Sequence, residues 1–75
     1  MPFTKVFTEK NWNISINDRR TELMFDNGYQ CAYASLDRDK RKFFFDRTIV
    51  PKYAHQKALK WALTPGNMVS IYSDI

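Results

Sequence analysis

The stretch NWNISIND, Asn11 to Asp18, alternates apolar and polar side chains with a period of two. Trp12, Ile14 and Ile16 fall on one face of an extended chain, whereas asparagine and serine side chains fall on the other. This alternation is typical of a strand that is buried on one face and exposed to water on the other. It therefore predicts that an antiparallel sheet forms the framework of the fold.

Further strands are predicted on both sides of this stretch. They are FTKVFT (residues 3–8), a weaker pattern, and TELMFD (21–26), YQCAYASL (29–36) and RKFFFD (41–46). The Asn27-Gly28 pair predicts a hairpin between the second and third of these, because both residues tolerate a positive φ. In the third, Ala32, Ala34 and Leu36 share one face. The pattern predicts an antiparallel meander of three or four strands.

The periodicity changes at Val50-Pro51. Ala54, Ala58, Trp61 and Ala62 recur at helical spacing, so residues 51–63 are predicted to form one helix, which Thr64-Pro65-Gly66 ends. NMVSIYSD (67–74) is expected to close the chain as a last strand. The predicted fold is a small α+β domain, residues 1–75, in which three to five antiparallel strands carry one helix on one face, in the order β-β-β-β-α-β.

Composition excludes several classes of function. One cysteine and one histidine, Cys31 and His55, are too few for the usual zinc sites, and no phosphate-binding glycine loop occurs. His55 is expected on a helix flank, without a catalytic motif around it. No apolar run approaches the ~20 residues that span a bilayer. We therefore expect a cytoplasmic protein that binds no cofactor or metal, does not associate with membranes and is not an enzyme.

Positive charge is concentrated in one part of the chain. The net charge is +4, yet residues 38–60 alone hold eight lysines and arginines against two aspartates. Concentrated cations attract polyanions such as nucleic acids. The residues expected to contact phosphates are Arg38, Lys40, Arg41, Lys42 and Arg47 of the basic hairpin, Lys52, Lys57 and Lys60 of the helix, and Arg19 and Arg20 of another turn.

Three consecutive phenylalanines, Phe43 to Phe45, make both faces of the basic strand apolar. The helix is expected to cover one face, leaving Phe44 on the other near Tyr29 and Tyr33. These rings are candidates for stacking on bases or for docking a protein. In a third interpretation, the N-terminal segment with Phe3 and Phe7 folds over them.

The run from Asp26 to Ala62 resembles the three-stranded-sheet-plus-helix DNA-binding domains of the AP2 type and of the arm-binding domains of phage integrases. The matching positions are Gly28, Tyr29, Ala32, Arg41, Lys42, Phe45, Asp46, Thr48, Ala54, Ala58 and Trp61. The resemblance implies a sheet lying in the major groove, with side chains of its exposed face reading base edges.

The leading expectation is therefore a non-catalytic domain that binds DNA or a nucleoprotein through its basic hairpin. The alternative is a stoichiometric protein-binding inhibitor, such as a phage-encoded anti-defence protein of the anti-CRISPR kind. The chain is similar to such proteins only in its small size and in the absence of catalytic motifs. A homodimer that buries the apolar excess of the strand Arg41–Asp46 is the third possibility. The sequence does not distinguish DNA, RNA and a host protein as the partner.

Overall fold

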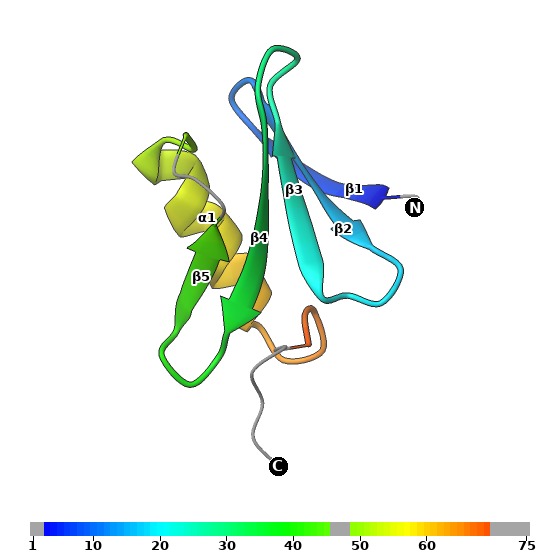
Figure 1. Ribbon diagram of the computed structural model, residues 1–75, viewed down its shortest axis with the longest axis vertical. Coiled ribbons are helices and arrows are strands. Elements are labelled where there is room, and N and C mark those ends of the chain that lie inside the picture. Colours follow the sequence, from blue (N-terminus) through cyan, green and yellow to red (C-terminus); the bar gives the residue numbers. More distant parts are fainter. Residues whose placement is uncertain (1–2, 46–48, 70–75) are drawn as a thin grey trace.

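The computed structural model, which describes residues 3–45 and 49–69, shows five antiparallel strands and one helix (Figure 1). The elements are β1 (Phe3–Glu9), β2 (Trp12–Asn17), β3 (Glu22–Asp26), β4 (Cys31–Asp37), β5 (Lys42–Phe45) and α1 (Lys52–Leu63). The strands are ordered β1-β2-β3-β4-β5, so each pairs with its neighbour in the chain, and α1 lies across one face of the sheet. The predicted α+β class and meander are confirmed.

The order of the elements differs from the expected one, which placed four strands before the helix and one after it. The weak N-terminal pattern forms a full strand of seven residues, so all five strands precede the helix. Asn67 to Val69 were expected to begin a strand after the helix, but they form no strand. Instead, the Val69 N–H donates to the Arg20 carbonyl at 2.7 Å, which ties this segment to a turn of the sheet. The remainder of the expected strand, residues 70–74, lies outside the described residues.

The predicted alternation decides which side chains form the core. Ile14 lies opposite Phe25, which lies opposite Ala32, and all three are buried between the sheet and α1. On the helix, the fully buried positions are Ala54, Ala58 and Ala62. Because these side chains are small, the helix backbone lies close to the sheet.

A bulge in β1 brings its second half into this core. The register shifts between Lys5 and Phe7, so that Phe7 pairs with Ile14 and therefore lies on the core face. Its ring centroid is 6.5 Å from that of Trp61 on α1. Phe3 lies before the bulge and pairs with Asn17 on the opposite face.

The predicted hairpin after β3 is present, but its loop is longer than the Asn-Gly pair suggested. Gly28 adopts φ +92°, whereas Asn27 acts through its side chain. The Asn27 carboxamide oxygen accepts hydrogen bonds from the Tyr29 and Gln30 N–H groups at 2.8 and 2.7 Å. As a result β4 begins at Cys31, and Tyr29, expected in this strand, lies in the loop.

The helix boundaries agree with the expected signals to within one residue. Pro51 is the N-cap, with its carbonyl accepting a hydrogen bond from the His55 N–H, so the helix begins at Lys52. At the other end, the Thr64 N–H donates to the Trp61 carbonyl, and Gly66 turns the chain with φ +90°.

Candidate nucleic-acid interface

Several of the predicted cations gather at one end of the molecule, which we call the basic end. It is formed by the β2–β3 turn, the β4–β5 turn and the C-terminus of α1, which lie together at the lower side of Figure 1. Its cationic residues are Arg19, Arg20, Arg38, Lys40, Arg41 and Lys60. Segments that are far apart in the sequence therefore bring cationic residues to the same end of the molecule, where they outnumber the exposed carboxylates of Asp18 and Asp39 in the two turns.

Arg38 anchors the β4–β5 turn to the end of the helix. Its guanidinium Nη1 donates to the Leu63 carbonyl at 3.1 Å, and Nη2 donates to the Met68 carbonyl at 2.8 Å and the Ala62 carbonyl at 3.4 Å. The last carbonyls of a helix have no partner within the helix and carry partial negative charge. Arg38 therefore caps α1, and these donors are engaged within the fold.

Arg20 has a similar role in the β2–β3 turn. Its Nε donates to the Asn67 carbonyl at 2.9 Å, and its own carbonyl accepts from the Val69 N–H. Its φ of +60° is uncommon for a residue with a side chain. Together, Arg20 and Arg38 attach the segment after the helix to two turns of the sheet. They shape the basic end rather than extend from it.

Lys40 and Arg41 are presented outward by the β4–β5 turn. The buried Asp37 carboxylate accepts a hydrogen bond from the Lys40 N–H at 3.1 Å, which stabilises the turn. The Arg41 N–H donates to the Arg38 carbonyl, and Arg41 adopts φ +55°. Both basic side chains are exposed. The backbone of the turn thus fixes where these two charges stand.

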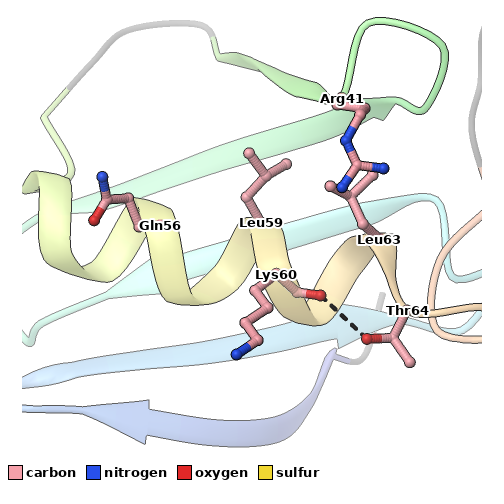
Figure 2. A pocket seen from close by; sticks show the side chains of 6 residues that line it. All are labelled: Arg41, Gln56, Leu59, Lys60, Leu63 and Thr64. Atoms are coloured by element: carbon pink, nitrogen blue, oxygen red, sulfur yellow. Dashed lines mark hydrogen bonds between the residues drawn. The ribbon is translucent and has the colours of Figure 1, made fainter.

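Arg41 and Lys60 border the same groove, of about 400 Å³, beside the C-terminal half of α1. Leu59 and Leu63 also line it, and Figure 2 shows Arg41 reaching from the hairpin to the end of the helix. A second groove of about 410 Å³ lies on the other flank, where Lys60 adjoins Phe7 and Trp61. Lys60 therefore stands between two partly apolar grooves.

The other predicted cations lie elsewhere. The Lys57 ammonium forms an ion pair with Glu9 at 2.9 Å and lies 5.7 Å from the centroid of the Phe7 ring. Lys52 is exposed at the start of α1, away from the basic end. Lys42 lies over the Phe44 ring at 5.8 Å. Arg47 lies outside the described residues.

The predicted aromatic residues are separate from the basic end. Phe44 lies opposite Ser35, so it shares the sheet face away from α1 with Tyr33, as expected. Tyr29 is 93% exposed in the β3–β4 loop, at the far end of the sheet from the basic end. The Phe3 ring lies 5.9 Å from Tyr33, so the N-terminal strand covers part of this face, whereas Phe7 packs on the other.

Carboxylates also lie on the face that carries Tyr33. Met24 is directly opposite Tyr33, and Glu22 and Asp26 flank Met24 on the same side of β3. A side-chain hydrogen bond between Tyr33 and Cys31 raises the pKa of the phenol above 10.0, and the charges of Glu22 and Asp26 raise it further. The aromatic face therefore lacks the positive excess of the basic end.

His55 lies half-buried on the flank of α1, as predicted. Its ring centroid is 5.5 Å from the centroids of both Phe43 and Phe45. Its Nε2 atom is buried and has no hydrogen-bond partner among the described residues. Burial without compensation disfavours the charged imidazolium, so desolvation lowers the pKa of His55 below 6.5.

This environment predicts a dependence of stability on pH. As the pH falls through 6.5, the unfolded chain binds a proton that folded His55 still excludes, so the free energy of unfolding decreases. The loss is complete below the folded pKa. Thermal unfolding across this range should show a midpoint that falls with pH, and His55→Phe should flatten the dependence. An equal slope in His55→Phe would assign the effect to other groups.

The sequence interpretation missed the residues that shape this end. The Asn67 side chain donates to the Trp61 carbonyl at 2.9 Å, and the Asn17 carboxamide oxygen accepts from the Thr21 and Glu22 N–H groups. The apolar lining of the groove was also missed. Leu59 and Leu63 follow His55 at intervals of four residues, a helical spacing that could have revealed this flank.

Comparison with protein-family models, curated proteins and solved structures finds no significant match to this chain. Within residues 3–45 and 49–69, no helix has the length and apolar character required to cross a membrane. The basic end, its two grooves and the aromatic face are therefore the features of the molecule that bear on its function.

Proposed function

We propose that this protein binds nucleic acid through its basic end, and that the nucleic acid is DNA. The observation that carries the proposal is that three separate segments, which carry Arg19, Lys40, Arg41 and Lys60, lie at the same end of the molecule (Figure 1). Clustered cations raise the local potential and release counterions from the phosphate backbone when they bind it. The proposal includes no catalytic step.

Different residues have different roles in this interface. Lys40, Arg41 and Lys60 contact phosphates, with Arg19 extending the surface from the β2–β3 turn. Arg20 and Arg38 hold the turns in place through backbone carbonyls. The resemblance to sheet-plus-helix DNA-binding domains implied contacts from the exposed sheet face. We favour the basic end because Glu22 and Asp26 on that face would repel phosphates.

Fluorescence anisotropy of labelled duplex and single-stranded DNA at several salt concentrations tests the proposal. Four phosphate contacts should give a slope of log K against log salt of about −3.6 on duplex DNA, from about −0.9 per contact. The double reversal Arg41→Glu with Lys60→Glu should remove two contacts and reduce the slope to about −1.8. It should also reduce the affinity for DNA by more than an equal change of net charge elsewhere on the surface does.

The matched control is Lys10→Glu with Lys52→Glu, which changes the net charge equally. Both residues are exposed and lie away from the basic end, the Lys10 ammonium being 4.9 Å from the centroid of the Tyr53 ring. This variant should keep a slope close to that of the wild type. Equal losses in the two double variants would reduce the binding to nonspecific attraction by net charge and contradict the proposed site.

A stoichiometric protein-binding inhibitor of the anti-defence type is the second candidate, and the grooves beside α1 favour it. Both grooves combine apolar side chains with the ammonium of Lys60. The apolar side chains are Leu59 and Leu63 on one flank of α1, and Phe7 and Trp61 on the other. Aromatic side chains and cations of this kind anchor protein interfaces. For this function, Leu59→Ser should reduce inhibition of the target while leaving the salt dependence of DNA binding unchanged.

A further inference from the structure

Two aromatic side chains other than the predicted ones adjoin the cations of the basic end. Phe7 on β1 and Trp61 on α1 line the groove of about 410 Å³ on one flank of the helix, and Lys60 borders the same groove. Both rings are only partly buried, and both pack against the core. The groove therefore places aromatic surface beside one of the cations that we assign to phosphate binding.

The two rings of this groove meet at an angle. Their centroids are 6.5 Å apart and their planes are inclined by 49°, so neither ring covers the whole face of the other. The Lys57 ammonium lies 5.7 Å from the centroid of the Phe7 ring, and an ion pair with Glu9 at 2.9 Å holds it there. Because Phe7 already has this cation beside it, Trp61 is the ring on which a flat ligand can stack.

The charges around the two grooves beside α1 favour an anionic ligand. Among the described residues, those that line the grooves include the cations Arg41, Lys57 and Lys60 and no carboxylate. The Glu9 carboxylate nearby is paired with Lys57, so Arg41 and Lys60 supply the positive excess. The last carbonyls of the helix would repel an anion, but they accept hydrogen bonds from Arg38, which offsets their partial charge.

The two grooves are continuous with each other across the end of the helix. Lys60 and Thr64 line both of them. Figure 2 shows Lys60 extending toward β1, on the side of α1 away from Arg41. A nucleic-acid strand whose phosphates contact Arg41 and Lys60 therefore crosses the last turns of α1 and brings its bases to the groove beside Trp61.

We propose that this groove, here called the tryptophan groove, accepts one unpaired base of a single-stranded DNA, which stacks on Trp61 while Lys60 contacts an adjacent phosphate. This role rests on the proposed function, because the cations of the basic end must hold the strand. The bases of a duplex are paired and stacked on one another, so only an unpaired base can enter the groove. A volume of about 410 Å³ lies within the range of ~300–1,000 Å³ typical of small-molecule sites.

Fluorescence anisotropy with two labelled single strands of about ten residues tests the proposal. One strand is an oligothymidylate, and the other is an abasic strand that presents the same phosphates without bases. The oligothymidylate should bind about tenfold more tightly, which is within the range that one stacked base contributes. It should also quench the fluorescence of Trp61, whereas the other tryptophan, Trp12, is 3% exposed and out of reach of a base.

Trp61→Leu keeps an apolar side chain against the core and removes the flat ring. It should lower the affinity for oligothymidylate about tenfold, to that of the abasic strand, and abolish the quenching. Its affinity for duplex DNA should be unchanged, which also shows that the variant is folded. Tyr29→Leu is the matched control, because it removes a ring that is 93% exposed at the far end of the sheet. It should leave every affinity unchanged.

The duplex measurement separates failure of the groove from failure of DNA binding. If duplex DNA binds with the expected salt dependence but the oligothymidylate binds no better than the abasic strand, the tryptophan groove does not hold a base. The basic end then remains a DNA site, and the groove is left to the protein partner of the second candidate function. Equal losses in Trp61→Leu and Tyr29→Leu would likewise overturn the proposal. Absence of binding to the duplex and to both single strands would overturn the proposed function itself.

Discussion

Replacing Phe25 by alanine is expected to lower the free energy of unfolding by about 3–5 kcal/mol. Phe25 is fully buried, and its ring centroid lies 6.0 Å from that of Phe43 and 5.6 Å from that of Phe45. It also lies between Ile14 and Ala32 on the neighbouring strands. Removing the ring leaves a cavity at the point where the sheet, the aromatic cluster and the helix meet.

The expected loss is a large part of the total stability. A domain of this length is stabilised by about 4–11 kcal/mol, from about 0.05–0.15 kcal/mol per residue. Urea unfolding followed by circular dichroism should therefore show Phe25→Ala with a much lower midpoint, or already unfolded. Tyr29→Ala is the control, because Tyr29 is 93% exposed and its change should stay within about 0.5 kcal/mol. Similar midpoints for both variants would contradict the described core.

Local pattern was sufficient to predict most of this core. The alternation of Trp12, Ile14 and Ile16 identifies the buried face of β2, and the alanine spacing identifies the buried stripe of α1. These features are predictable because burial repeats with the period of the element itself. The bulge in β1 was not predictable in this way. The extra residue between Lys5 and Phe7 moves each later side chain of β1 to the opposite face of the sheet, and nothing in the amino-acid composition of the strand indicates it.

The predicted interface illustrates a different limit. A sequence shows that Arg38 and Arg41 are cations, but it does not show which carbonyls lie within reach of each. Arg38 donates to carbonyls 24 to 30 residues away, at the end of α1 and in the segment after it, whereas Arg41, three positions on, is exposed beside a groove. Likewise, the basic and the aromatic residues of one short stretch of sequence lie on two different surfaces of the molecule. Lys40 and Arg41 belong to the basic end, whereas Phe44 lies on the sheet face away from α1, which also carries Glu22 and Asp26.

Arg38→Gln is therefore expected to reduce stability, by about 2–3 kcal/mol, because it removes charge-assisted hydrogen bonds from the partly buried carbonyls of Leu63 and Met68. Arg38→Lys should recover only part of this loss, since one ammonium does not reproduce the fork of donors that a guanidinium presents. Thermal and urea unfolding of both variants provide the measurement.

Arg41→Gln gives the complementary result and separates anchoring from binding. It removes the same charge three residues away, yet stability should change by less than about 0.5 kcal/mol, because the Arg41 side chain is exposed. DNA affinity, in contrast, should fall, with a slope against log salt smaller by about 0.9. If Arg38→Gln instead kept wild-type stability and lost DNA affinity, Arg38 would be a phosphate contact, and the attachment of the hairpin to the helix would rest on other residues.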